Sequence, residues 1–228
     1  MILAAGRGER MRPLTDRVPK PLQLVHGKPL IVWQVERLAA AGFTDLVINH
    51  AWLGEQIEGA IGDGARWGVT VRWSREGTAL GTAGGVATAL PLLTAPAFLL
   101  VSADLYTTYR YARLRAPLEA FIADPAGTTE AHLVLVDDPR YPQDFSLLDD
   151  RVTAVGQNAG TYGNMGVFRR RFFEALPPGQ PAELGPLLHA AVARNVLSGE
   201  YYRGRWVNVG TAADLEQLEL GPDLDAGP

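Results

Sequence analysis

The chain has 228 residues, of which 47% are hydrophobic and 20% charged, so it is long enough and apolar enough to fold around a sizeable core. It has no cysteine, which excludes disulfides, a thiol nucleophile and thiolate metal ligands. Its net charge of −4 disfavours nucleic acid and anionic membranes as partners, and no apolar run is long enough to span a bilayer.

In the first half of the chain, short apolar runs alternate with segments of helical periodicity. Strands are predicted at residues 1–5, 45–49, 69–73 and 97–101, and helices at 29–41, 54–61 and 84–90. Continuously apolar strands that alternate with helices favour a parallel sheet covered on both faces. We therefore predict the α/β class, with a single Rossmann-like domain whose central sheet is mixed, mostly parallel and flanked by helices.

The second half is less regular. Its pattern predicts strands at 132–136 and 162–168, a strand within 201–209, a hairpin of 145–148 with 152–155, and helices at 111–121, 183–196 and 214–220. No repeat, low-complexity tract or change in composition marks a linker, so one domain is expected over residues 1–220. Its halves are expected at about 1–106 and 107–220, with the second half building a lid, and residues 221–228 are expected to be a disordered tail.

The first 24 residues are the most informative stretch. The first predicted strand runs into a loop with Gly6 and Gly8, and glycines let a backbone approach a phosphate closely and point N–H groups at it. Arg10 and Lys20 add positive charge, and the prolines that flank Lys20 hold it in a stiff, extended stretch. The loop lacks the third glycine of a dinucleotide fingerprint and the Gly-Lys-Ser/Thr of a Walker A loop. An ordinary strand and loop with surface arginines is the alternative.

Three motifs in this stretch, Leu-Ala-Ala-Gly-x-Gly, Arg-Met-x-Pro-Leu-Thr and Pro-Lys-Pro, resemble the signature of the sugar-1-phosphate nucleotidyltransferases. The resemblance implies a GT-A-like domain that transfers a nucleoside monophosphate from a nucleoside triphosphate to a sugar 1-phosphate. It also implies that Arg10 binds the β- and γ-phosphates and that Lys20 binds the α-phosphate and the sugar phosphate. The residues implied to cradle the nucleotide are Leu3, Ala4, Ala5, Gly6 and Gly8.

Residues 80–85, Leu-Gly-Thr-Ala-Gly-Gly, resemble a second motif of the same family. The stretch follows a predicted strand and opens a helix, where Gly81 allows a close approach and the helix N-terminus offers unpaired N–H groups. The resemblance implies that Gly81 and Thr82 contact the nucleobase. A glycine-rich turn with Thr82 as the helix N-cap is the alternative.

Asp104 follows a wholly apolar strand, and the matching aspartate of the family binds Mg²⁺. Mg²⁺ takes one or two carboxylates together with phosphate oxygens, so a single aspartate suits it. A capping or surface aspartate is the alternative. Ser102 matches a sugar-binding position, although this chain has Ser-Ala-Asp where related enzymes carry Asn-Gly-Asp.

Two more positions follow from the resemblance. Trp-Val-Asn-Val-Gly-Thr at 206–211 is similar to the Trp-x-Asp-x-Gly-Thr pattern that holds the family's second metal carboxylate, so Asn208 is a predicted Mg²⁺ ligand without charge. The alternative is that Asn208 only shapes the turn. Asn164, in Asn-Met-Gly-Val, resembles the family's strand beside the sugar and is predicted to bind it. Glu76 and Glu130 are further candidates for binding hydroxyl groups.

Within the family, Gly-Glu-Arg-Met at 8–11 and Ile-Asn-His-Ala-Trp-Leu-Gly at 48–54 resemble the short N-acetylmuramate-1-phosphate uridylyltransferases of peptidoglycan recycling. The implied substrates are UTP and N-acetylmuramate 1-phosphate. A mannose-1-phosphate guanylyltransferase and, because of Asn208, a non-catalytic nucleotide-sugar sensor are the alternatives. We expect a cytoplasmic monomer with neither nucleic acid nor membrane as a partner, because the apolar start is too short for a signal peptide and nothing requires an oligomer.

Overall fold

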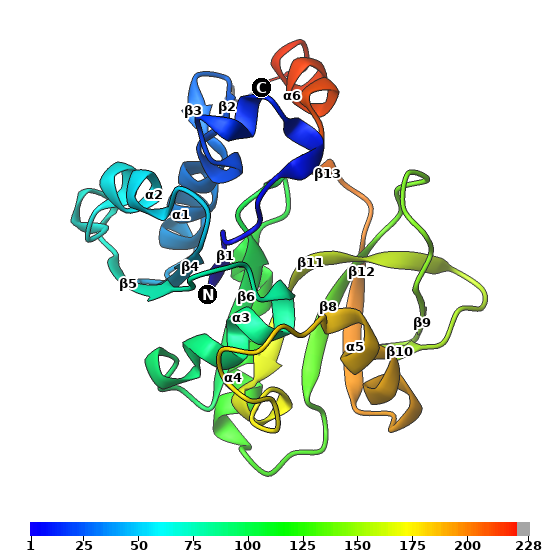
Figure 1. Ribbon diagram of the computed structural model, residues 1–228. Coiled ribbons are helices and arrows are strands. Elements are labelled where there is room, and N and C mark those ends of the chain that lie inside the picture. The colour runs from blue at the N-terminus through cyan, green and yellow to red at the C-terminus, as the bar shows by residue number, and fades with distance from the viewer. Residues whose placement is uncertain (223–228) are drawn as a thin grey trace. The chain divides into compact units, whose positions relative to one another are not determined.

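The computed structural model describes residues 1–222, which form two compact units. The first unit contains Ile2–Ala79, Ser102–Ala112 and residues 204–222, and the second contains Met1, Leu80–Val101 and Arg113–Arg203. In Figure 1 the first unit consists of the blue and cyan elements, a short green stretch and the orange-to-red end of the chain.

This division differs from the predicted halves, 1–106 and 107–220. Residues 80–101 belong with the second unit, and residues 204–222 belong with the first. Of the predicted tail, residues 223–228 lie outside the described part of the chain.

The first unit contains a parallel sheet in the order β5-β4-β1. Strand β4 (Asp45–His50) pairs with β1 (Ile2–Leu3) on one side and with β5 (Thr70–Arg75) on the other, both in parallel. The remaining elements are the hairpin strands β2 (Leu24–Val25) and β3 (Lys28–Pro29), the paired strands β7 (Leu105–Thr107) and β13 (Trp206–Asn208), the helices α1 (Leu30–Ala40), α2 (Gly54–Ile61) and α6 (Ala212–Glu219), and the 3-10 turns η1 (Glu9–Met11), η2 (Leu14–Asp16), η3 (Lys20–Leu22) and η4 (Ala65–Trp67).

Helix α1 shows how the sequence sets the bounds of an element. Pro29 is the N-cap residue, where its missing N–H costs nothing. Apolar side chains at helical spacing, among them Leu30, Trp33 and Leu38, are buried. Gly42 follows the C-cap with φ +80°, the left-handed conformation in which helices commonly end.

One hydrophobic cluster in the first unit joins segments that are far apart in sequence. Met11 after β1, Tyr106 in β7 and Val209 after β13 pack with residues of α1, α6 and the β2 strand. The ring of Trp33 lies edge-on against Tyr106, with centroids 5.3 Å apart. Each such side chain, when fully buried, contributes roughly 1.5–3 kcal/mol. This packing holds the loop near residue 11 and the segments near residues 105 and 208 together.

The strands of the second unit follow the order β6-β11-β8-β12-β10-β9, and β11 also pairs with β9. The pairings therefore close β11, β8, β12, β10 and β9 into a ring. The strands are β6 (Ala97–Ser102, of which Ser102 belongs to the first unit), β8 (Ala131–Val136), β9 (Phe145–Leu148), β10 (Arg151–Thr153), β11 (Ala159–Arg169) and β12 (Leu197–Tyr202). The helices are α3 (Gly81–Ala89), α4 (Arg115–Ala123) and α5 (Leu184–Ala193), with 3-10 turns η5 (Leu90–Leu92), η6 (Tyr111–Leu114, which begins in the first unit) and η7 (Arg170–Phe172).

The prediction of a mostly parallel sheet describes the first unit but not the second. Among the pairings described within the second unit, only β8 with β12 is parallel, and β11 runs antiparallel to β6, β8 and β9. A strand that is buried on both faces has a continuous apolar sequence whether it pairs in parallel or antiparallel, so the sequence pattern did not show the orientation. The turn at Asp149, with φ +54°, makes β9 and β10 an antiparallel hairpin, as predicted.

Other differences are local. Helix α3 begins at Gly81 rather than at residue 84. The range 201–209, predicted to include a strand, contains the end of β12 and all of β13, which belong to different units. Strand β7 and the β2–β3 hairpin were not predicted, because runs of two or three residues carry no readable period. Within residues 1–222, no helix has the length and apolar character needed to cross a membrane.

Candidate active site

Lys20 and Asp104 are bonded to each other in the first unit. The Lys20 ammonium donates to Oδ2 of Asp104 across 84 residues of sequence, and their side chains are only 14% and 21% exposed. Lys20 begins the turn η3, with Pro19 extended before it and Pro21 buried after it. The sequence predicts an extended stretch at Lys20, and this is wrong for Lys20 itself, because only Pro19 is extended and Lys20 already belongs to the turn. The bond to Asp104 fixes the position of the ammonium.

Asp104 is placed by backbone bonds to two other segments. The N–H of Ala103 donates to the carbonyl of Leu3 at 2.9 Å, so Asp104 follows directly beside the end of β1. The N–H of Val209 donates to the Asp104 carbonyl at 2.9 Å, and Asn208 lies opposite Leu105 in the β7–β13 pairing. Within the first unit the structure thus brings together Leu3, Lys20, Asp104 and Asn208.

The glycine loop after β1 has one open and one crowded glycine. A Cβ on Gly6 would meet nothing within 4 Å, so the backbone there is accessible to a ligand. Gly8 has φ +70°, and a Cβ on it would come within 2.9 Å of Thr15 Cγ2 and 3.1 Å of Lys20 Cβ. Gly8 is therefore required both by its backbone conformation and by its contact with Lys20. Ala4 and Ala5, between the strand and the glycines, are buried.

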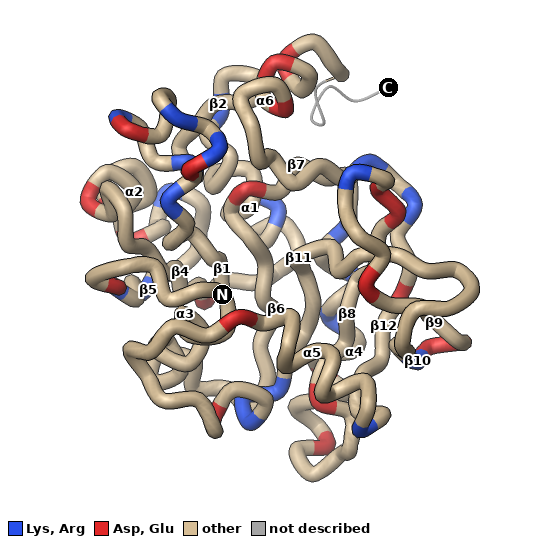
Figure 2. Tube along the Cα trace, turned by 45° about the vertical axis from the view of Figure 1, so that its right-hand side comes forward, with Lys and Arg blue, Asp and Glu red and all other residues tan. Residues whose placement is uncertain are grey.

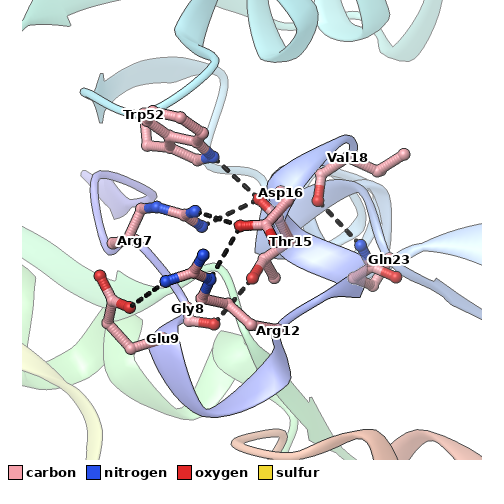
Figure 3. Close-up of polar contacts among 9 residues, drawn as sticks. All are labelled: Arg7, Gly8, Glu9, Arg12, Thr15, Asp16, Val18, Gln23 and Trp52. Carbon is pink, nitrogen blue, oxygen red and sulfur yellow. Dashed lines mark hydrogen bonds and ion pairs between the residues drawn. The ribbon is translucent and has the colours of Figure 1, made fainter.

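The segment from residue 7 to residue 20 is strongly basic within an acidic protein, with five Lys or Arg and two Asp or Glu (Figure 2). Arg7 and Arg12 are both paired with Asp16, as Figure 3 shows. The hydrogen bond from Arg7 holds the pKa of Asp16 below its ordinary value. Arg10 is exposed, and among residues 1–222 its side chain has no hydrogen bond or ion pair. Its guanidinium lies against Gly210, where a Cβ would be 2.8 Å from Nη2.

Gly81 and Thr82 lie in the second unit, in the first turn of α3. Gly81 has φ +69°, and a Cβ there would come within 2.7 Å of the Ala182 carbonyl oxygen. That oxygen accepts the third and fourth N–H groups of the helix, at 3.0 and 3.1 Å. The N-cap residue is Leu80, and no side chain caps the helix, so the alternative role of Thr82 as N-cap is wrong. The first two N–H groups of the helix, those of Gly81 and Thr82, take no part in the bonds to Ala182.

Asn164 lies in β11, also in the second unit. Its φ is +54°, and the register between β11 and β8 shifts between Tyr162 and Gly166. Such bulges re-aim side chains, and a non-glycine residue held in the left-handed region within a strand is a common feature of functional sites. This geometry distinguishes Asn164 from an ordinary core-strand residue. Ser102 is half-buried at the end of β6, in the first unit.

Asn49 is a residue of the site that the sequence did not single out. Its side chain is 1% exposed; Oδ1 accepts the N–H of Ala4 at 2.9 Å, and Nδ2 donates to Glu76 at 2.6 Å. It thus fixes the start of the glycine loop. The signal available in the sequence was a polar residue directly after the apolar run 46–48, since buried amides are kept only where their hydrogen bonds are satisfied. Glu76, considered above for hydroxyl binding, is buried beside it.

Asp104 and Asn208 supply one carboxylate and one amide oxygen from adjacent segments. Mg²⁺ is held in proteins by one or two carboxylates and completes its shell with phosphate oxygens and water. The two residues therefore fit an ion that is shared with a phosphate ligand. Within residues 1–222, no group of three or more His, Cys, Asp or Glu could hold a metal ion by itself. The turn after Asn208 is fixed by the capping box of Thr211 and Asp214, which leaves Asn208 outside the helix cap.

Comparison with known proteins shows which family the chain resembles. The N-acetylmuramate alpha-1-phosphate uridylyltransferase of Neisseria meningitidis serogroup B is 46% identical over 225 residues, which cover 96% of each chain. The mannose-1-phosphate guanylyltransferase of Mycobacterium tuberculosis is 28% identical over 94% of this chain, which spans 62% of that relative's length. The crystal structure of a candidate glucose-1-phosphate thymidylyltransferase of Bacillus anthracis has a TM-score of 0.80 at 18% identity, covering 96% of this chain and 92% of that one.

The family model described as nucleotidyl transferase matches residues 1–145, which include the glycine loop, Lys20, the start of α3 and Asp104. Together with the 46% identity over nearly the whole chain, this match settles the family. The chain belongs to the nucleotidyl transferase family.

Proposed function

We propose that the chain transfers a uridylyl group from UTP to N-acetylmuramate 1-phosphate, giving UDP-N-acetylmuramate and pyrophosphate. The observation that carries this proposal is the Lys20–Asp104 pair near the open backbone at Gly6, in a chain that is 46% identical to an N-acetylmuramate alpha-1-phosphate uridylyltransferase. The role belongs to the recycling of peptidoglycan. A monomer in the cytoplasm, acting on small molecules without nucleic acid or membrane, is part of the proposal.

The reaction is an in-line displacement. An oxygen of the sugar phosphate forms a bond to the α-phosphorus of UTP, and the bond from that phosphorus to the bridging oxygen breaks, so that pyrophosphate leaves with its electron pair. The attacking phosphate is already anionic, so no protein nucleophile or general base is required. Catalysis then consists of positioning the two phosphates and stabilising the charge that develops between them.

Different residues bind different parts of the two substrates, and most of those that bind phosphate belong to the first unit. The open backbone at Gly6 and the exposed guanidinium of Arg10 bind the β- and γ-phosphates, which later leave as pyrophosphate. The Lys20 ammonium binds the α-phosphate and the sugar phosphate, exchanging its contact with Asp104 for phosphate oxygens. Leu3, Ala4 and Ala5 continue the nucleotide cradle, and Ser102 contacts the sugar. Gly81 and Thr82 of the second unit contact the base, and Asn164 contacts the sugar.

Asp104 and Asn208 are the residues that would hold Mg²⁺, which when bound neutralises the charge of the phosphates. The fold proposed for this chemistry is the Rossmann-like, GT-A-like arrangement. Its support in this chain is the parallel β5-β4-β1 sheet, with the glycine loop leaving the carboxyl end of β1.

The test is pyrophosphate release by the purified chain with Mg²⁺, each of the four nucleoside triphosphates and a panel of sugar 1-phosphates. Release with UTP and N-acetylmuramate 1-phosphate, and little with other pairs, is the expected result. A preference for GTP with mannose 1-phosphate would support the proposed nucleotidyl transfer but show that the substrates are different ones.

Failure of every pair, combined with tight binding of a nucleotide sugar in calorimetry, would overturn the proposed catalysis and identify a sensor. The observation that favours keeping this second candidate is the amide at position 208, where a carboxylate would bind a metal ion more strongly. Lys20→Met serves as the inactive control for contaminating enzymes.

A further inference from the structure

Among the described residues, most of the loop between β1 and the β2–β3 hairpin makes only short-range backbone hydrogen bonds. The backbone hydrogen bonds described for residues 8–22 join partners at most four residues apart, as in the turns η1, η2 and η3, and the carbonyl of Gln23 accepts the N–H of Leu30 at 3.0 Å. Such bonds fix the local shape of the loop but not its place on the sheet. Side chains must supply that placement, because the loop carries both Arg10 and Lys20.

Three side chains of the segment 49–56 reach this part of the chain. Asn49 accepts the N–H of Ala4 at 2.9 Å. Trp52 donates its indole N–H to the carbonyl of Thr15 at 2.9 Å, and Gln56 donates to the carbonyl of Arg17 at 3.1 Å. These side chains therefore hold the loop at its start and on each side of Asp16, and they come from the end of β4, the turn after it and the first turn of α2.

Trp52 makes the contact with the loop at Thr15. The Thr15 carbonyl accepts both the Trp52 indole and a guanidinium N–H of Arg7, each at 2.9 Å (Figure 3). The same guanidinium lies 4.0 Å over the Trp52 ring and donates to Asp16 at 2.5 Å. Trp52 is 38% exposed, so its contribution to the core is limited, and its polar and stacking contacts give it a role in the loop.

The contact continues from Thr15 to the catalytic lysine. The Thr15 hydroxyl donates to the Gly8 carbonyl at 2.9 Å. Gly8 is packed so closely that a Cβ would come within 2.9 Å of the Thr15 side chain and 3.1 Å of the Lys20 Cβ. A shift of Thr15 would therefore move Gly8 and Lys20 with it.

We propose that Trp52 is a positioning residue for nucleotidyl transfer, which holds Lys20 and the glycine loop in their reactive geometry through Thr15 and Arg7. This inference rests on the proposed function and deepens it. It also accounts for the run His50-Ala51-Trp52-Leu53-Gly54. The His50 ring occupies the space of a Gly54 Cβ, 1.8 Å from its Nδ1, so α2 begins close enough for Trp52 and Gln56 to face the loop.

The experiment compares Trp52→Phe with Trp67→Phe. Trp67 is a matched control, because it also stacks under an arginine, Arg66 at 3.6 Å, and donates its indole N–H, to Glu36 at 3.3 Å, but it lies in η4 away from the loop. We expect Trp52→Phe to lower kcat about tenfold, since small misplacements of reacting groups are costly. We expect Trp67→Phe to leave kcat near that of the unmodified chain.

Hydrogen exchange gives a second readout that does not depend on turnover. Amides of residues 9–23 should exchange faster in Trp52→Phe than in Trp67→Phe, while exchange in β4 and β5 stays the same in both. Gln56→Ala, which removes an exposed contact, should show a smaller effect of the same kind and serves if Trp52→Phe does not fold.

The outcomes separate this inference from the proposed function. Equal kcat and equal loop exchange in the two tryptophan variants would overturn the positioning role, even with full activity of the unmodified chain. No turnover by the unmodified chain would overturn the proposed function, and the exchange comparison would still decide whether Trp52 holds the loop.

Discussion

Lys20 and Asp104 neutralise each other at a place where little water reaches them. Their side chains are 14% and 21% exposed, and the ammonium donates directly to the carboxylate. In the absence of phosphate, each is the partner that makes burial of the other tolerable. Binding of an anionic substrate and a cation offers both groups new partners, so the pair can separate without leaving a charge unpaired.

The first prediction follows from this pair. Lys20→Met should lower kcat/KM by about two orders of magnitude, the usual scale for losing one preorganised electrostatic group. Asp104→Asn should do the same, and the double variant should be little worse than either single one, because the two residues act as a unit. Lys28→Met is the control, since the Lys28 ammonium is also bonded to a carboxylate of the first unit, Glu36 at 2.7 Å. Steady-state pyrophosphate release measures all four. Turnover near normal in Asp104→Asn would contradict the assignment.

The second prediction separates backbone strain from contact at Gly8. Gly8→Ala and Gly27→Ala both place alanine at φ +70°, which costs about 1–2 kcal/mol of stability. Only Gly8 crowds Thr15 and Lys20, whereas nothing lies within 4 Å of a Cβ on Gly27. Both variants should therefore unfold at lower denaturant concentration, but only Gly8→Ala should lose activity, by tenfold or so as Lys20 is displaced. Equal activities would show that the contact with Lys20 has no catalytic consequence.

Part of the site could be predicted because it consists of short motifs of residues that are close together in sequence. The glycine loop is one example, since Gly8 has the positive φ that glycine permits. The prolines around Lys20 were less informative, because Lys20 begins a 3-10 turn and is not extended as predicted. An aspartate after an apolar strand likewise predicted a charge at a strand end, and Asp104 lies there, beside β1. The catalytic, nucleotide-binding and sugar-binding roles of these residues stay predictions.

The remainder depends on contacts between distant segments, which local patterns do not encode. The bond from Asn49 to Ala4 joins residues 45 apart, and the indole of Trp52 reaches a backbone carbonyl that any residue could provide. The pairing of Asn208 with Leu105 uses strands of three residues, too short for a period. The closed ring in the second unit was missed for the related reason that apolar strands do not reveal their direction.

The third prediction concerns the amide at position 208. Asn208→Asp adds a carboxylate opposite Leu105, next to Asp104, and should lower the Mg²⁺ concentration needed for half-maximal activity severalfold. Asn195→Asp, at an exposed position in the second unit, makes the same chemical change and should have no such effect. Titration of Mg²⁺ in the turnover assay provides the measurement. If Asn208→Asp left the Mg²⁺ dependence unchanged, position 208 would be a turn residue and not a ligand.

The last prediction is a pH dependence of stability that comes from His132 in β8. Burial lowers the pKa of His132, against the opposing effect of Glu200 and Asp150. Its Nδ1 lies 3.0 Å from the Ser198 hydroxyl. Because the folded-state pKa lies below the unfolded value of about 6.5, the unfolded chain binds more protons between the two values. The contribution to stability is therefore complete above pH 6.5 or so and is lost as the pH falls to the folded pKa.

Denaturant unfolding at a series of pH values between neutral and mildly acidic measures this slope. His132→Gln should flatten it, because the titrating group is gone, while His189→Gln removes a histidine from α5 of the same unit and should leave most of the slope in place. An unchanged slope in His132→Gln would mean that the ring accepts its proton in the folded chain as readily as in the unfolded one. The lowering of the His132 pKa by burial would then be cancelled by Glu200 and Asp150, the two carboxylates that raise it.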